Sequence, residues 1–491
     1  MKKVASTTLI LALTAAAYTA SAWYLGKEVE AQIASQYSNL IASQPYLKIV
    51  ERDYQRGIFT SEETVTLSFF ELSGMEKLDT STDSTDENSL LMTFHSRIQH
   101  GPFPGFSTLA AATSETELVL DTEAREEVAK IMGDKRPYTQ QTEIRFDGSG
   151  TATFSSPKFE SAMPDQTGEI SRISWEGIEG KMDFSPDFSA FTMHVKAPKL
   201  EISDEKGGRV HFSDVVIEGD QQQIFPDLPY MYSGTTRFSI GEVSMVGIDE
   251  TMAPLSLNNL VYDIDLPLQG DHLDVLTKMG IDKLSVGDES FGPIHMDFSF
   301  KHLHARALAE INQKLMAVYS DPNLFNGGTK EITEGFQSAL MTHAETLLTQ
   351  DPEFSLDRVS FANTDGEAKL AARVKLSGAT LEMLANPLML LSKLEASGDL
   401  SLSETMVVKL LQNPPFPAKP DQDTTSTEEI KEKREMAVGQ FQQQVAMLME
   451  QGYLEREGEI IKTTMAFKEG QLTVNGKPFN PAAMSQPPTH Q

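Results

Sequence analysis

The chain contains 491 residues, of which 41 are basic and 71 are acidic, so its formal net charge at pH 7 is -30. This sign argues against nucleic-acid binding, which depends on cations that displace counterions from phosphates. The absence of cysteine excludes disulfides, thiolate metal sites and cysteine nucleophiles, while a hydrophobic content of 40% is typical of a globular protein with a core.

The N-terminal segment has the pattern of an export signal. Lys2 and Lys3 precede an uncharged stretch from Val4 to Tyr24, and about 20 residues of this kind can cross a bilayer as a helix. Positive charges stay in the cytoplasm, so the rest of the chain is expected on the far side of the membrane. The expected anchor residues are Leu9, Ile10, Leu11 and Leu13, with Trp23 and Tyr24 at the interface.

A cleaved signal peptide is the alternative for the same segment. Ala20-Ser21-Ala22 is an acceptable small-x-small cleavage site, and the most apolar part, residues 9–17, is short enough for the core of a signal peptide. Both interpretations place the body of the protein outside the cytoplasm.

Strands dominate residues 54–302, which follow a linking helix expected over 26–53. In the clearest alternation, every second residue is apolar and the residues between them are polar. The apolar residues are Ile294, Met296, Phe298 and Phe300. A period of two with one apolar face is typical of antiparallel sheets that have one buried face and one face in water. We therefore expect Phe298 in a core or an apolar groove, and Ser299 on the wet face.

Helices return after residue 303. Helical spacing predicts two helices over 308–318 and 332–347, and strands are expected over 354–376. A single apolar helix is expected over 381–394, although it contains Pro387.

The C-terminal part begins with a linker. Three prolines in four positions make 413–425 the clearest linker of the chain. Ser426 and Glu429 form a capping box for a helix that is expected to run to Tyr453. A closing hairpin is expected around the turn Lys468-Glu469-Gly470.

Together these patterns predict an α+β chain that is mainly β. We expect an extended antiparallel sheet-rich body, a few helices in the C-terminal half and an N-terminal hydrophobic helix. The predicted segments are 1–25 (membrane anchor or signal), 26–53 (linking helix), 54–302 (β-rich domain), 303–412 (helical hairpin, strands and helix), 413–425 (linker), 426–478 (helix and hairpin) and 479–491 (flexible tail).

Motifs of catalysis are missing from the sequence. It has no Gly-x-Ser-x-Gly elbow, no His-Glu-x-x-His and no nucleotide-binding glycine loop. His302 and His304 have a spacing that zinc or copper can use, and His95 and His100 flank Arg97, but neither pair has an identifiable third ligand. The sequence therefore predicts no enzyme, no metal and no cofactor.

Four short motifs remain: Trp23–Lys27, Tyr54–Ser61, His100–Pro104 and the stretch Glu457–Gly476. In this order they resemble the YdgA-like family of bacterial envelope proteins, a domain family of unknown function. The resemblance implies an inner-membrane or periplasmic protein of a Gram-negative bacterium with no established activity. The motif residues singled out are Tyr54, Arg56, Gly57, Phe59, His100, Gly101, Pro102, Phe103, Pro104, Gly470, Asn475 and Gly476.

The motifs also have a physical reading as turns. Gly57 permits φ > 0 or a close backbone approach, and Arg56 is able to hold the turn through a carboxylate. Gly101-Pro102-Phe103-Pro104 predicts a rigid elbow at the end of the strand that carries His100.

The favoured function is a non-enzymatic, membrane-tethered periplasmic protein that binds or passes an apolar envelope ligand. Its expected location is the inner membrane, with the body in the periplasm and lipid or envelope proteins as partners. A structural scaffold is the alternative, followed by an unrecognised envelope hydrolase. The sequence does not choose between an open groove and a closed core, because both need the same alternation, and it does not give an oligomeric state.

Overall fold

The computed structural model describes residues 2–44, 47–70, 89–164, 170–247, 253–319, 329–384, 386–414 and 427–479. By spatial contacts the chain divides into two units. The first comprises residues 1–205, 211–238 and 308–342, and the second comprises 206–210, 239–307 and 343–491. Most of the predicted linker, and the predicted tail after Phe479, lie outside the described residues.

Helix α1 (Lys2–Ser43) opens the first unit as one continuous helix. It joins the predicted anchor to residues 26–43 of the predicted linking helix, because residues 2–43 contain no proline and only one glycine, Gly26. Residues 47–53 form a strand instead of the predicted helix, since β1 (Leu47–Arg56) begins there. The helix ends two residues before Pro45, where the chain can no longer continue a helix easily.

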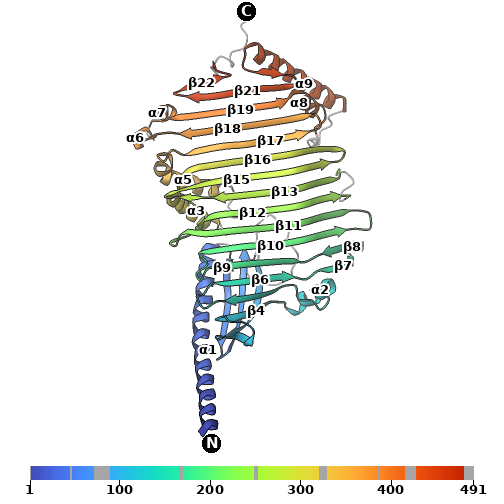
Figure 1. The fold of residues 1–491 in the computed structure, drawn as a ribbon. Helices are drawn as coiled ribbons and strands as arrows, with labels where there is room; N and C mark the ends of the chain where they lie inside the picture. The colour runs from blue at the N-terminus through green and yellow to red at the C-terminus, as the bar shows by residue number, and fades with distance from the viewer. Residues whose placement is uncertain are drawn as a thin grey trace, which may run out of the picture. The chain divides into compact units, whose positions relative to one another are not determined.

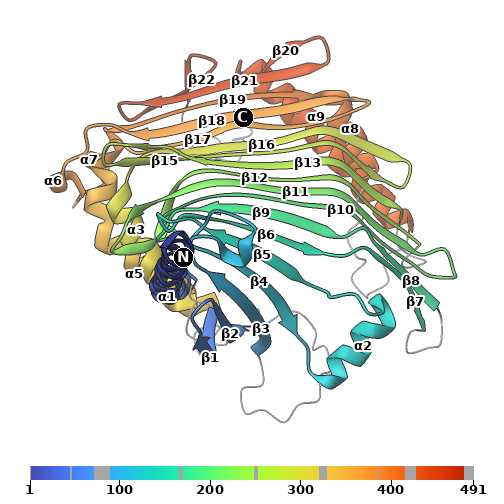
Figure 2. The same cartoon turned by 60° about the horizontal axis from the view of Figure 1, so that its bottom comes forward.

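The sheet of the first unit is antiparallel throughout, and α1 lies along its early strands (Figures 1 and 2). Its strand order is β1 (Leu47–Arg56), β2 (Thr60–Phe70), β3 (Ser89–His100), β4 (Ala112–Val119), β5 (Thr139–Ile144), β6 (Gly150–Ser156), β9 (Ile178–Phe184) and β10 (Ala190–Ser203). The loops carry η1 (Pro104–Phe106) and α2 (Thr122–Met132).

Two strands of this sheet are interrupted at the same level. After Pro157-Lys158 the line of β6 continues as β7 (Phe159–Pro164), and Glu176-Gly177 separates β8 (Ile170–Trp175) from β9. Strand β10 spans the interruption between β8 and β9, since it pairs with β9 through its first half and with β8 through its last residues, and β7 remains paired with β8. The strands on both sides of the interruptions therefore remain paired with their neighbours.

The strands of the second unit are also antiparallel (Figure 1). The order is β13 (Leu255–Leu266), β15 (His272–Val286), β16 (Glu289–His304), β17 (Glu353–Asn363), β18 (Gly366–Leu376), β19 (Leu394–Ser403) and β21 (Ile460–Lys468). Short strands extend its edges: β14 (Leu268–Gln269), β20 (Glu455–Glu457), β22 (Gln471–Val474) and β23 (Lys477–Pro478).

The remaining elements complete the two units. The helices of the second unit are α6 (Leu381–Leu384), α7 (Pro387–Leu391), α8 (Glu404–Gln412) and α9 (Thr427–Glu450). Residues of both units occur in β11 (Arg209–Phe225), β12 (Leu228–Val246), α3 (Ala305–Tyr319) and α5 (Thr329–Leu348).

The mainly β, antiparallel prediction and the N-terminal helix are confirmed, but two details were wrong. The predicted helix over 381–394 is two short helices, since Pro387 disfavours a helical residue before it and the Asn386 side chain caps α7 at the Leu388 amide. Helix α2 was missed, although its signals are local: Asp121 caps the Ala124 amide and Gly133 follows with φ 64.

The core of the first unit lies between α1 and the sheet. Val29 of α1 is buried against Ile98, Ala112 and Ile144 from β3, β4 and β5. Further along the helix its amide side chains bind loop carbonyls: Gln32 to Gly148, Gln36 to Pro186 and Asn39 to Asp187. The helix is therefore attached to the sheet at several levels.

Candidate functional site

Three of the four sequence motifs meet around one segment of α1. The first motif lies on the helix itself, the second forms the β1–β2 turn, and the third ends β3. His100 connects them: its Nδ1 lies 2.9 Å from the carbonyl oxygen of Ala22 and its Nε2 lies 3.1 Å from the Ser61 hydroxyl. Residues that are far apart in the sequence are thus joined through one buried imidazole.

The hydrogen bonds assign the tautomer of His100. A backbone carbonyl can only accept, so Nδ1 carries the proton that is donated to Ala22, and Nε2 accepts from the Ser61 hydroxyl. Burial lowers the pKa of His100 against the hydrogen bond to Ala22, which raises it, and the nearby positive charge of Arg56 lowers it further. The imidazole is therefore a neutral connector.

Two glycines allow α1 and the end of β3 to lie in close contact at this junction. A Cβ atom on Gly26 would lie 2.4 Å from Cε1 of His100, so only glycine lets the helix approach this closely. Gly101 has φ 136 and packs against Ala22, in a backbone conformation that other residues rarely adopt. Gly57 makes the expected close approach, since its amide donates to Thr60 at 2.8 Å.

Aromatic rings surround this junction on its outer side. The Tyr18 ring stacks on Phe59 and Phe106, with centroids 6.0 and 5.9 Å apart, and its hydroxyl donates to the Phe103 carbonyl. The Arg56 guanidinium lies over the Trp23 ring and 3.4 Å from the carboxylate of Glu30. We call the apolar set the collar: Tyr18, Trp23, Tyr24, Ile58, Phe59, Phe103, Phe106 and Leu109. Apart from the half-buried Tyr18, all of its members are exposed.

The fourth motif lies apart from this junction, in the closing hairpin of the second unit. Gly470, Asn475 and Gly476 all have positive φ in tight turns. The side chain of Asn475 accepts from the Thr464 amide at 2.8 Å. This motif shapes a hairpin, as predicted from the turn Lys468-Glu469-Gly470.

A second candidate surface is the apolar face of the sheet in the second unit. One row across its strands pairs Val275, Phe300, Phe354, Val374, Ala396 and Phe467. Several apolar side chains of this face are well exposed: Phe300 (39%), Val374 (40%), Met296 (42%) and Met465 (44%). At one end of the strands α8 contacts β18 and β19, with Met406 buried there.

The opposite face of these strands reverses the expectation for Ser299. Ser299 is 0% exposed and Ser355 and Glu353 are also buried, although the alternation suggested water on this side. Glu353 forms ion pairs with Lys301 and Arg373, whose side chains lie on the same face. The alternation is correct, but the polar side chains are the buried ones.

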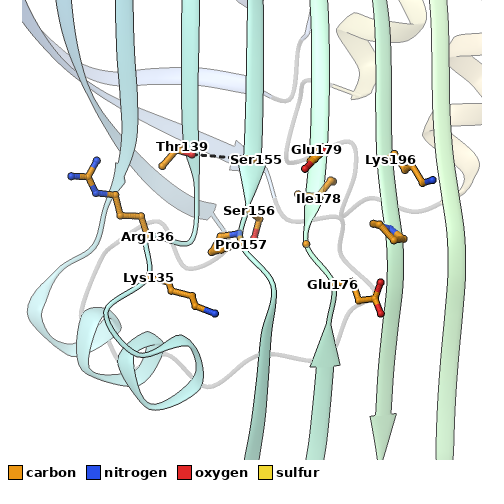
Figure 3. A pocket seen from close by; sticks show the side chains of 12 residues that line it. Lys135, Arg136, Thr139, Ser155, Ser156, Pro157, Glu176, Ile178, Glu179 and Lys196 are labelled. Atoms are coloured by element: carbon orange, nitrogen blue, oxygen red, sulfur yellow. Dashed lines mark hydrogen bonds between the residues drawn. The ribbon is translucent and has the colours of Figure 1, made fainter.

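A pocket of about 600 Å³ lies on the polar face of the first unit, at the strand interruptions. Figure 3 shows basic and acidic side chains around it, including Lys135, Lys196, Glu176 and Glu179. Two residues of its lining, Thr139 on β5 and Ser155 on β6, are register partners, and their hydroxyls form a hydrogen bond of 3.1 Å. Its mixed charges select no single ligand class.

The histidine pairs do not form a metal site among the described residues, where no group of three His, Asp or Glu side chains is suitably placed. His304 accepts from the Ala307 amide at the start of α3, and His302 lies 3.2 Å from the Asp351 carbonyl. His95 lies 3.3 Å from the hydroxyl of Thr64, on the neighbouring strand. Each ring has a structural partner.

The predicted anchor lies on α1, where Leu13, Trp23 and Tyr24 are exposed. Leu9, Ile10 and Leu11 belong to the same helix, and their side chains lie outside the described part. Among the described residues, no helix is both long and apolar enough to span a membrane.

Comparison with known proteins confirms the family resemblance. A family described as "Bacterial protein of unknown function (DUF945)" matches residues 1–482. The chain is 19% identical to Protein YdgA of Escherichia coli (strain K12) over 373 residues, which cover 72% of this chain and 71% of that protein. It is 20% identical over 340 residues to an uncharacterized protein of Haemophilus influenzae, covering 65% of this chain and 87% of the other. No solved structure matches.

Proposed function

The chain belongs to the DUF945 family of bacterial proteins of unknown function, and we propose that it is a membrane-tethered periplasmic protein without enzymatic activity. In this proposal the sheet of the second unit binds, or passes along, an apolar ligand of the envelope. The observation that carries it is the exposed apolar face of that sheet.

Exposed apolar surface of this kind argues for a ligand. Antiparallel sheets normally bury the apolar face and wet the polar one, but here Ser299 is buried while Phe300 and Met296 are exposed. Contiguous apolar patches on soluble surfaces are typical of interaction sites. The rings of Phe300 and Phe354, with centroids 4.7 Å apart, and the flexible side chains of Met296 and Met465 suit an irregular apolar partner.

Tethering is supported by the sequence and by the position of the collar. Lys2 and Lys3 precede the uncharged stretch Val4–Tyr24, which gives the length and polarity of a span with a cytoplasmic N-terminus. The collar lies where that stretch ends on α1.

A pair of substitutions on adjacent strands tests ligand binding. Val374 on β18 belongs to the apolar face, whereas Ser397 on β19 is exposed on the opposite face. Val374→Asp should reduce the phospholipid that co-purifies with the protein, measured by native mass spectrometry, because it places a carboxylate on the apolar surface. Ser397→Asp adds the same charge and should leave the lipid unchanged.

A structural scaffold is the second candidate, because the same apolar face could cover another envelope protein. Protein that carries no phospholipid and retains a stoichiometric protein partner through detergent extraction would favour the scaffold. Equal lipid loss in Val374→Asp and Ser397→Asp would contradict binding at the apolar face.

A further inference from the structure

The collar exposes apolar side chains from three segments beside α1, and ligand binding by the second unit does not explain this exposure. Tyr18, Trp23 and Tyr24 come from the helix, Ile58 and Phe59 from the β1–β2 turn, and the other members from the β3–β4 connection. Phe106 is 82% exposed and Leu109 is 65% exposed. None of the collar residues carries a charge.

The collar is held in place by the fold. Tyr18 lies in stacking contact with both Phe59 and Phe106, and its hydroxyl is bound to the Phe103 carbonyl at 2.8 Å. Phe106 itself has φ 59, which is rare for a residue other than glycine. The backbone therefore adopts an unfavourable conformation that leaves this ring exposed beside Tyr18.

We propose that the collar rests in the boundary between headgroups and acyl chains of the leaflet from which α1 emerges. This proposal rests on the membrane tether proposed above and adds a second contact with the same membrane. Aromatic side chains favour this boundary because they combine an apolar ring with polar edges or hydroxyls.

The length and charge of α1 agree with this position. On α1 the collar spans residues 18–24, and the helix from Val4 to these residues extends for about 22–31 Å, so that it reaches the boundary of a hydrocarbon core about 30 Å thick. Charged side chains follow directly: Lys27 and Glu28 are exposed, and Arg56 lies over Trp23 and is paired with Glu30. Lys27 and Arg56 are the cations that would face lipid phosphates at this boundary.

The missing cysteines give a direct experiment. Full-length Phe106→Cys protein, labelled with an environment-sensitive fluorophore and reconstituted into phosphatidylcholine vesicles, should lose about half its emission or more when the lipids carry a shallow nitroxide quencher, because the label lies at the interface. Ile58→Cys is a second reporter in another segment of the collar.

Phe146→Cys is the matched control. Phe146 is an exposed aromatic residue of the same unit, in the β5–β6 turn. In this turn Gly148 binds Gln32, which lies about 15 Å further along α1 than Ala22. The label on the Phe146→Cys protein should therefore show little quenching.

The outcomes separate the two proposals. Protein that floats with the vesicles but shows equal quenching at residues 58, 106 and 146 would overturn the collar contact and leave the tether intact. Protein that does not float with the vesicles would overturn the tether, and the collar contact with it. Quenching confined to residues 58 and 106 would support both.

Discussion

Gly26→Ala is the sharpest test of the junction, because general helix propensity and this structure predict opposite signs. In an open helix position the change from glycine to alanine stabilises by about 1 kcal/mol. At Gly26 the new Cβ would lie 2.4 Å from Cε1 and 2.6 Å from Nδ1 of His100. The imidazole cannot move freely, since Ala22 and Ser61 bind both of its nitrogens.

The magnitude follows from the crowding. Inserting a methyl group into a packed site costs about 1–3 kcal/mol, so the net effect after the propensity gain is a loss of about 0–2 kcal/mol. Gly439 in α9 is the control, since a Cβ there meets nothing within 4 Å. Gly439→Ala should raise the free energy of unfolding, so that the two substitutions differ by about 1–3 kcal/mol.

Urea titration in detergent micelles provides the measurement. The only tryptophans, Trp23 and Trp175, belong to the first unit and report its unfolding by fluorescence, while circular dichroism follows the loss of all helices, including α9. In a His100→Ala background the crowding disappears, and Gly26→Ala should become stabilising. If Gly26→Ala stabilises the wild-type protein as much as Gly439→Ala does, the packing of His100 against α1 is wrong.

Three further changes test other parts of the structure. Burial lowers the pKa of His100 in the folded state, so the first unit should have its full stability above the ordinary value of about 6.5 and lose stability as the pH falls toward the lowered folded pKa; His100→Gln should abolish this part of the pH dependence in urea titrations. Burial raises the pKa of Glu63 even though Arg52 lies 2.6 Å away, so Arg52→Met should cost about 3–5 kcal/mol at pH 7 by leaving a buried charge, and less as the pH is lowered and Glu63 takes up a proton; a loss that does not change with pH would contradict this. The Ser299 hydroxyl is buried without a hydrogen-bond partner in the part of the chain that the structure describes, so calorimetry should show Ser299→Ala as neutral or stabilising by up to about 1 kcal/mol, and a clear loss of stability would mean that the hydroxyl has a partner.

Much of the fold follows from local signals in the sequence. The alternation in β16, the turn at Gly470 and the capping signals before α9 each depend on neighbouring residues, and the structure has these elements where the sequence places them. The break before Pro387 was also readable, because proline restricts the residue before it.

Local sequence patterns do not predict the packing of His100 against α1, or which face of the strands in the second unit is exposed. No neighbouring residue in the sequence explains the glycine at position 26. Its reason is His100, 74 residues later, whose ring lies against it in the fold. Likewise, alternation shows that Ser299 and Phe300 lie on opposite faces, but the choice of which face is covered depends on distant elements.

The attachment of α1 to the sheet also has a mechanical consequence. A helix of 42 residues is about 63 Å long, and its bonds through Ala22, Gln32 and Asn39 make the helix and the first sheet move as one lever. A tilt of about 10° at the N-terminal end would displace the other end by about 11 Å. A change in the angle of α1 would therefore be transmitted to the first unit as a rotation of its strands.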